Sequence, residues 1–341
     1  MITKVKLLLL IILMSGFYQL LHSQDVHFSQ RLAGDKQRNP AFTNQFEGSW
    51  QAFTVYRQQW QSIGVPFTTS SIFATKRFYT DLPALQFYGG LVLTNDQSGD
   101  AKLTANQFQL NLGASIELEE NTFTFFVSNS FTIKSFNQNG LTFPSQYDRS
   151  IGGFNENLSS GESFQGESTS YFDLSVGGLL ERELNERWSL TTGASALHLL
   201  QPNESFFDGG NQRSLGYGVQ AELEYDFTDF LNLFPYVSFY RSNGASETLI
   251  GSSVLFNTAV FGPIENIKPF LYLRTGIDRL SDAIILGSNA TIGNFQVGAS
   301  YDFNISELEI ASNYQGGFEL TLSYTGKGPQ HKKRRIPCER Y

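Results

Sequence analysis

The sequence predicts an all-β fold, a transmembrane outer-membrane β-barrel of about 14 antiparallel strands with periplasmic termini. The main observation is a repeated pattern, in segments of about ten residues, of alternating apolar and polar side chains separated by turns. In one segment Phe108, Leu110 and Leu112 alternate with Gln109 and Asn111. Successive strand side chains point to opposite faces, so one face suits lipid and the other suits water.

The composition agrees with this fold class. Aromatic residues make up 14% of the chain and occur at segment ends as well as centres, as interfacial girdles require. Charged residues make up only 16%, below the roughly 25% of an ordinary soluble domain. The mean hydropathy of -0.21 is compatible with a barrel, because half of each strand faces the lumen. A net charge of -8 argues against nucleic acid as a partner. The partner that the barrel itself implies is outer-membrane lipid.

Residues 1–23 resemble a secretory signal peptide. Lys4 and Lys6 precede an apolar run from Leu7 to Met14, and Ser23 offers a small residue for cleavage before Gln24, although Leu21 is bulkier than usual at such a site. The alternative is a membrane anchor, but the apolar run is shorter than the roughly 20 residues of a spanning helix. We therefore expect export to the cell outer membrane. Cys338 is the only cysteine and has no intrachain disulfide partner.

The alternation defines the strands in order. They run over Gly48–Tyr56, Thr68–Phe78, Gln86–Thr94, Lys102–Leu118, Thr122–Lys134, Thr169–Glu181, Arg187–Leu199, Leu215–Phe227, Leu231–Arg241, Thr248–Thr258, Pro269–Ile277, Ala283–Ser288, Asn294–Asp302 and Gly317–Tyr324. Polar side chains for the lumen include Gln107, Gln109, Asn111, Gln220, Glu222 and Glu224. The stretch Ser306–Asn313 fits either a further strand or a helical turn.

Loop lengths fit an even strand number. Such barrels have short periplasmic turns and longer outer loops. If the first strand runs outward, the periplasmic turns include those near Glu119–Asn121 and Thr228–Asp229, whereas the long polar stretches Ser135–Ser168 and Gln201–Ser214 lie outside.

Two segments are expected to lie beyond the barrel, which gives four parts. They are a signal peptide (1–23), a periplasmic N-terminal segment (24–47), the barrel (48–325) and a basic periplasmic C-terminal tail (326–341). The tail contains five consecutive basic residues, His331 to Arg335. Such a charge run is either a solvated segment or a docking tail for a periplasmic partner, and the sequence leaves both open.

Three short features, in order, resemble the PorP/SprF family of outer-membrane proteins of the Bacteroidetes type IX secretion system. The first is Gln24–Gln30 followed by Asn39-Pro40-Ala41, and the second is Tyr56-Arg57-Gln58-Gln59-Trp60. The third is Ser300-Tyr301-Asp302 with Gly317-Phe318-Glu319-Leu320 and the closing basic tail. The stretch Ala33–Arg38 departs from the family by being more polar than usual.

The resemblance implies a non-enzymatic component that assists delivery or surface attachment of large adhesin-like proteins. Its implied partners are the secretion machinery and such a secreted protein. The residues that would bind partners are His27, Phe28, Ser29, Gln30, Asn39, Pro40, Tyr56, Arg57, Trp60, Lys332, Lys333, Arg334 and Arg335. The alternative function is an outer-membrane porin or a channel for hydrophobic substrates, for which the lumen must be open.

The sequence contains no catalytic constellation, so we expect no enzyme, no cofactor and no metal site. A hydrolase requires a nucleophile beside an oriented base. His198, at the end of a predicted strand, is better explained as an interfacial or capping residue. The oxygen-rich stretch Asn95–Asp100 lacks the spacing of a calcium loop and is typical of a turn.

Overall fold

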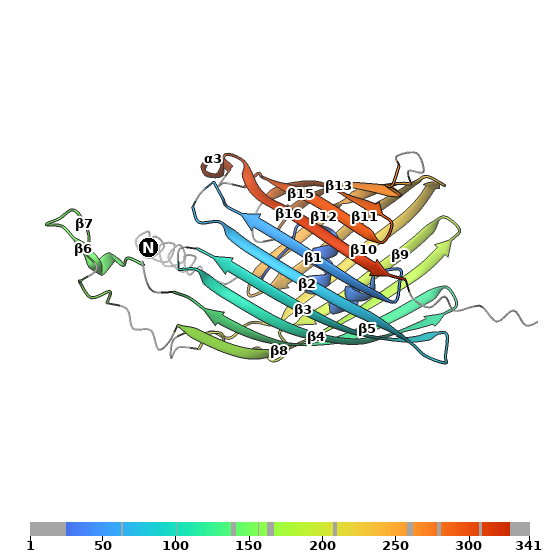
Figure 1. The fold of residues 1–341 in the computed structure, drawn as a ribbon, viewed down its shortest axis with the longest axis horizontal. Helices are drawn as coiled ribbons and strands as arrows, with labels where there is room; N and C mark the ends of the chain where they lie inside the picture. The colour runs from blue at the N-terminus through green and yellow to red at the C-terminus, as the bar shows by residue number, and fades with distance from the viewer. Residues whose placement is uncertain are drawn as a thin grey trace, which may run out of the picture.

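The computed structural model is a closed antiparallel β-barrel of 14 strands (Figure 1). The described residues are 25–62, 64–99, 101–137, 141–155, 157–161, 167–206, 210–257, 262–277, 281–306 and 309–327. The wall consists of β1 (Trp50–Gln59), β2 (Phe67–Tyr79), β3 (Leu85–Ser98), β4 (Leu103–Leu118), β5 (Asn121–Ser135), β8 (Ser168–Asn185), β9 (Trp188–Leu197), β10 (Gly216–Thr228), β11 (Leu231–Ser242), β12 (Ala245–Asn257), β13 (Asn266–Thr275), β14 (Ala283–Ile292), β15 (Phe295–Asn304) and β16 (Gln315–Gly326).

Neighbouring wall strands follow one another along the chain, and β16 closes the barrel by pairing with β1. Closure satisfies the backbone hydrogen bonds that an open edge would leave exposed to lipid. The predicted fold class is therefore confirmed, and each predicted strand overlaps one wall strand. Among the described residues, none of the helices is long and apolar enough to cross a membrane.

The two ends of the barrel differ. Residues 136–167 and 198–215 connect strands at one end, here called the loop end, whereas residues 119–120 and 229–230 form tight connections at the other, the turn end. The loop end also carries the short 3-10 helix η2 (Pro144–Gln146), the two-stranded hairpin of β6 (Tyr147–Asp148) and β7 (Gly153–Phe154), and α3 (Glu309–Ser312). The ambiguous stretch Ser306–Asn313 thus contains a helical turn rather than a strand in its described part.

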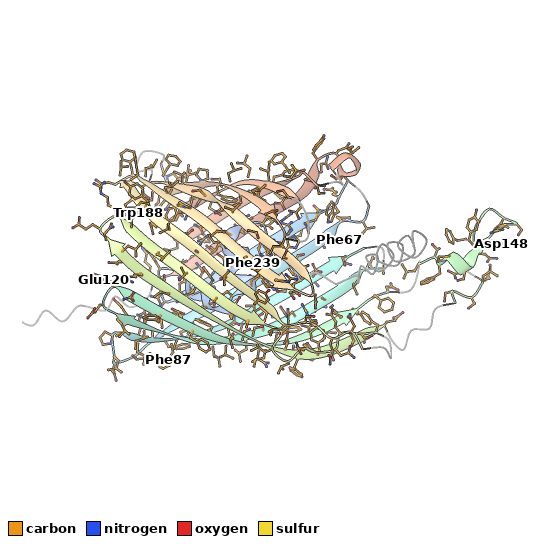
Figure 2. The ribbon with its side chains drawn as sticks, turned by 180° about the vertical axis from the view of Figure 1, so that it is seen from behind. Phe67, Phe87, Glu120, Asp148, Trp188 and Phe239 are labelled. Atoms are coloured by element: carbon orange, nitrogen blue, oxygen red, sulfur yellow. The ribbon has the colours of Figure 1, made fainter. Side chains whose placement is uncertain are left out.

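The wall buries polar side chains and exposes apolar ones. Leu110 and Leu112 are 46% and 57% exposed on the outer face, whereas Asn111 between them is fully buried in the lumen. Figure 2 shows the side chains that project outward along the wall, and Trp188 marks the turn end. There Trp188 stacks on Tyr225 with ring centroids 4.4 Å apart, as expected of a girdle at a lipid–water boundary. The predicted face assignment of this strand is confirmed.

An arginine on the lipid face should destabilise the barrel more than one on the lumen face. We expect Leu110→Arg or Leu112→Arg to lower the free energy of unfolding by about 2–4 kcal/mol, because the charge must leave water. Gln107→Arg is the matched control, since Gln107 lines a cavity in the lumen. Reversible denaturant unfolding in lipid vesicles measures the difference. An equal cost at all three positions would mean that the assignment of the lipid and lumen faces is wrong.

Candidate functional site

Residues 25–44 lie inside the barrel and run from its loop end to its turn end (Figure 1). This segment, here called the plug, contains α2 (Arg31–Arg38) and the 3-10 helix η1 (Pro40–Asn44). Its first described residue, Asp25, contacts the loop end through His198, whereas Asn44 donates to the hydroxyl of Thr124, near the turn end of β5, at 3.1 Å. The expectation that residues 24–47 stand outside the barrel, at the end where β1 begins, is therefore corrected for residues 25–44.

The local structure of the plug follows from its Asn-Pro step. A residue before proline avoids helical backbone angles, and Asn39 accordingly has φ -135° and ψ 106°, which ends α2. Pro40 then occupies the first turn of η1, where its missing N–H is not required. The side chain of Asn39 accepts a hydrogen bond from the Ala41 N–H at 3.0 Å. The Asn39-Pro40-Ala41 motif is thus the corner between the two helices of the plug.

A buried ion pair joins the first and last strands of the wall. Arg57 of β1 and Glu319 of β16 are direct register partners across the closing seam. The Arg57 Nη1 lies 2.5 Å from the Glu319 Oε1, and both side chains are fully enclosed. The Arg57 Nη2 lies 2.9 Å from the Oδ2 of Asp302 on β15. One guanidinium therefore links three wall strands.

The plug is bound to the same charges. Both oxygens of Glu319 accept backbone N–H groups of the plug, one from Ser29 and one from Gln30, the latter at 2.8 Å. The Ser29 hydroxyl donates to the Asp302 Oδ2 at 2.6 Å. Charge-assisted hydrogen bonds of this kind are stronger than neutral ones. The side chains of Ser29, Arg57, Asp302 and Glu319, with Arg274, are here called the seam cluster.

Arg274 of β13 completes the seam cluster and balances its charge. Its Nη1 lies 3.0 Å from the Asp302 Oδ2, and its Nε lies 2.9 Å from the Oδ1 of Asp282. Arg274 also donates to the Ser29 hydroxyl at 3.0 Å. Two guanidinium groups thus face the carboxylates of Asp302 and Glu319 in a site closed to water, with Asp282 at its edge. Such a site is stable only when every charge has a partner.

Further polar contacts fix the plug to the opposite wall. Arg38 Nη1 lies 2.8 Å from Glu247 Oε1 on β12, and Arg31 Nη1 lies 3.0 Å from Glu222 Oε2 on β10. The hydroxyl of Tyr236 on β11 donates to the Asp35 Oδ1 at 2.5 Å. The polar face of the lumen therefore supplies partners to successive polar residues of α2, which explains why a segment this polar is buried.

Asn39 contacts the wall where it contains glycine. Its amide nitrogen donates to the carbonyl oxygens of Gly178 and Ala194, each at 3.3 Å. A Cβ added to Gly177 would lie 2.0 Å from the Asn39 Oδ1, and one added to Gly193 would lie 2.8 Å from the ring of Phe42. Glycine at these two positions lets the plug approach the backbone of β8 and β9.

At the loop end the plug begins at a second charged group. The carboxylate of Asp25 accepts hydrogen bonds from Arg213 and from the Tyr240 hydroxyl at 2.5 Å, and one oxygen lies 3.1 Å from the His198 Nε2. The other ring nitrogen of His198 lies 2.5 Å from the Asp173 Oδ2. His198 thus links two carboxylates within the loop end, rather than capping a strand at the interface.

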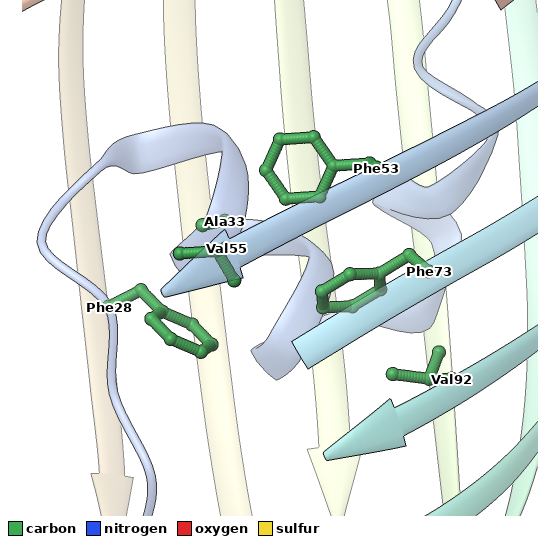
Figure 3. Packing of buried hydrophobic residues seen from close by; sticks show 6 residues of the cluster. All are labelled: Phe28, Ala33, Phe53, Val55, Phe73 and Val92. Atoms are coloured by element: carbon green, nitrogen blue, oxygen red, sulfur yellow. The ribbon is translucent and has the colours of Figure 1, made fainter. Parts of the chain in front are cut away.

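Apolar packing on two sides holds the plug in place. Phe28 and Ala33 pack with Phe53, Val55, Phe73 and Val92 from β1, β2 and β3 (Figure 3). Ala41 and Phe42 pack with Tyr88, Phe126 and Leu179. Burying a large apolar side chain stabilises by about 1.5–3 kcal/mol. These contacts make the plug part of the core of the barrel.

Burial in the lumen shifts the pKa values of two neighbouring groups on α2. Desolvation lowers the pKa of Lys36 to about 7, and it raises the pKa of Asp35 to about 6 despite the favourable charge of Arg31. Lys36 donates instead to the carbonyl oxygen of Phe42 at 3.2 Å. The Lys36 amine thus contacts an uncharged carbonyl group, which agrees with its lowered pKa.

The plug separates two cavities. The turn-end cavity has a volume of about 970 Å³ and is lined by the plug residues Gln30, Arg31, Leu32 and Asn44, by the following Gln45 and Phe46, and by wall residues. The loop-end cavity has a volume of about 400 Å³ and is lined by Asp25, His27 and wall residues. The described lumen is therefore divided by a folded segment.

The structure brings together many of the residues that the sequence predicts as partner-binding. Phe28, Ser29, Gln30, Asn39, Pro40 and Arg57 are buried at the contact of plug and wall. His27 and Trp60 line the loop-end cavity, and Tyr56 is 40% exposed on the outer face. Lys332, Lys333, Arg334 and Arg335 lie outside the described residues. The buried six contact the barrel itself in this conformation.

Arg274, Asp302 and Glu319 are not among the site residues predicted from the sequence, although the last two belong to the motifs of the family resemblance. Each is a charged residue in a strand, on the face that alternation assigns to the lumen. A charged residue at a lumen-facing position of a strand indicates a site, because a buried charge is costly without a partner. The sequence does not show that these three residues, from three different strands, contact the same plug.

The arrangement offers charge pairing rather than reaction chemistry. The guanidinium and carboxylate groups of the seam cluster pair with one another, although the Arg57 Nε and the Asp302 Oδ1 have no hydrogen-bond partner among the described residues, and both ring nitrogens of His198 contact carboxylates. Among the described residues, no group of three His, Cys, Asp or Glu side chains is close enough to hold a metal ion. Asn95–Ser98, part of the predicted turn, continue β3 instead.

Comparison with known proteins gives a family and a fold. The sequence profile described as "Type IX secretion system membrane protein PorP/SprF" matches residues 20–324. No curated protein matches the chain.

Among solved structures, the "TodX monoaromatic hydrocarbon channel deltaS2 mutant" is 10% identical with a TM-score of 0.52, covering 87% of this chain and 94% of its own. The "CymD monoaromatic hydrocarbon channel" is 10% identical with a TM-score of 0.50, covering 86% and 93% respectively. At such identity the likeness shows the fold alone.

Removing one partner of the seam cluster should loosen both the closing seam and the plug. We expect Arg57→Met to cost about 3–5 kcal/mol, because Glu319 would remain buried without its cation. The double variant Arg57→Met with Glu319→Gln should lose less, since it removes both charges and a glutamine oxygen still accepts from the plug.

Stability of the barrel is measured as the temperature at which the folded, fast-migrating form is lost on gels. Protease cleavage within residues 25–44 measures how firmly the plug is held. If the double variant is as unstable as the sum of the two single variants, the pair is not coupled and the assignment is wrong.

Proposed function

Because this chain belongs to the PorP/SprF family of type IX secretion system membrane proteins, we propose that it is a non-enzymatic outer-membrane component that assists the delivery or surface attachment of large adhesin-like proteins. Its partners would be components of the secretion machinery and the secreted protein. The supporting observation is the plug: residues of the motifs quoted for the family resemblance, among them Ser29, Asn39 and Arg57, fix the plug to the wall and so divide the lumen. A scaffold needs such rigidity, whereas a general diffusion pore needs an open path.

The exposed ends of the molecule are the surfaces suited to partners. The loop end presents the hairpin of β6 and β7, which extends away from the wall (Figure 2, near Asp148). The turn end presents a cavity rimmed by charged residues such as Glu120. Partner binding through Phe28 or Asn39 would require release of the plug, since both are buried. Tyr56 and Trp60 need no such release, since Tyr56 is exposed on the outer face and Trp60 lines the loop-end cavity.

A second candidate function is a channel for hydrophobic substrates. Its support is the shared fold with the two hydrocarbon channels, whose names state that activity for those proteins. In this reading the plug would be a gate, and the loop-end cavity a substrate entry. Loss of the gene would remove a surface protein if the secretion role is right, and would reduce uptake of hydrophobic solutes if the channel role is right.

Deletion of the gene should separate the two. We expect growth and small-solute uptake to remain nearly unchanged while a cognate surface protein is lost from the cell surface or released into the medium. Surface proteome analysis and uptake assays, with complementation by the wild-type gene as the control, provide the measurement. An unchanged surface proteome together with reduced uptake of hydrophobic solutes would contradict the secretion role and support the channel.

A further inference from the structure

The turn-end cavity is rimmed by carboxylates. Its lining includes nine glutamates, Glu47, Glu117, Glu119, Glu120, Glu181, Glu183, Glu222, Glu224 and Glu265. The basic residues in the same lining are fewer, namely Arg31, Arg77, Arg182, Lys268 and Lys327. A concave site lined by an excess of one charge concentrates ligands of the opposite charge.

Six of these glutamates are not neutralised within the fold. Glu222 is paired with Arg31 of the plug at 3.0 Å. In contrast, no basic group of the described chain lies within ion-pair distance of Glu47, Glu117, Glu119, Glu120, Glu183 or Glu265. Carboxylates without a basic partner in the fold are available to pair with a cationic ligand.

The plug contributes an unused acceptor to the same cavity. Asn44 lines the cavity and is 6% exposed. Its amide nitrogen donates to Thr124, but its Oδ1 has no donor among the described residues. A buried acceptor without a donor is unfavourable, so this atom independently indicates a ligand that brings N–H groups.

The chain itself carries a cationic segment to this place. β16 ends at Gly326 at the turn end, and Lys327 already lines the cavity. The sequence then continues through His331-Lys332-Lys333-Arg334-Arg335. An extended chain spans up to about 3.3–3.6 Å per residue, so the whole basic run lies within roughly 30 Å of Lys327 along the chain. Tethering also gives the segment an effective concentration in the millimolar range.

We propose that the basic run of this chain's own tail, residues 331–335, docks in the turn-end cavity of the same molecule. The arginine and lysine side chains pair with the unneutralised rim glutamates, and an N–H group of the tail supplies the missing donor to Asn44. The tail thereby covers the end of the plug. This intramolecular site does not depend on the secretion role, and it competes with any partner that would bind the tail.

The single native cysteine makes the proposal measurable in the full-length protein. Cys338 follows the basic run closely, so an introduced cysteine has one intrachain partner. Glu120→Cys places a thiol on the rim of the cavity. Asp229→Cys is the matched control: it is also exposed in a tight connection of the turn end, but it does not line the cavity. A disulfide requires the two Cα atoms to approach within about 7 Å.

We expect the Glu120→Cys variant in detergent to form its intrachain disulfide at least about tenfold faster than the Asp229→Cys variant under mild oxidation at low salt. Replacing Lys332, Lys333, Arg334 and Arg335 by glutamine, or adding about 0.5 M salt, should abolish the difference. Gel migration without heating verifies that each barrel is folded, and Glu183→Cys is a second rim variant.

Equal rates for rim and control cysteines, or a rim rate that does not respond to tail neutralisation and salt, would overturn the proposal. The tail would then be a solvated segment or a ligand for another protein.

Discussion

The buried pair of Arg57 and Glu319 is the interaction on which the rest of the structure depends. The two residues face each other across β1 and β16, so the pair lies at the seam that closes the barrel. Glu319 also accepts the backbone N–H groups of Ser29 and Gln30, and through them fixes the plug. Closure of the wall and seating of the plug therefore use the same carboxylate. Neither charge would be stable in this enclosed site without the other.

The lumen behaves as a polar core. In a soluble domain, polar residues of a helix usually face water, but the barrel reverses the arrangement because its outer face must be apolar. Asp35, Lys36 and Arg38 of α2 are thus among the most enclosed side chains of the chain. Each finds a partner of matching chemistry, a tyrosine hydroxyl, a backbone carbonyl and a glutamate respectively. These partners explain why the polar stretch Ala33–Arg38 is buried.

Alternation along the chain was enough to predict the wall, because successive side chains of each strand face the lipid and the lumen in turn. Leu110, Asn111 and Leu112 show this directly. The same rule failed for residues 25–44, which lack alternation and contain many charges, so they resembled a solvated segment. Their burial depends on contacts over long sequence distances, such as Ser29 with Glu319, and local pattern carries no information on these. The motifs of the family resemblance did contain the answer in part, since Ser29, Arg57, Asp302 and Glu319 all belong to them.

For function, the consequence is that the plug divides the lumen into two cavities, one toward each end of the barrel. The central claim is that the plug is a stable part of the barrel. Hydrogen–deuterium exchange of the purified protein in lipid tests it most directly, because buried, hydrogen-bonded amides exchange only on opening. The account predicts that peptides covering residues 28–44 exchange as slowly as those from β1 and β16. Complete exchange of these peptides within seconds, while the strands stay protected, would contradict it.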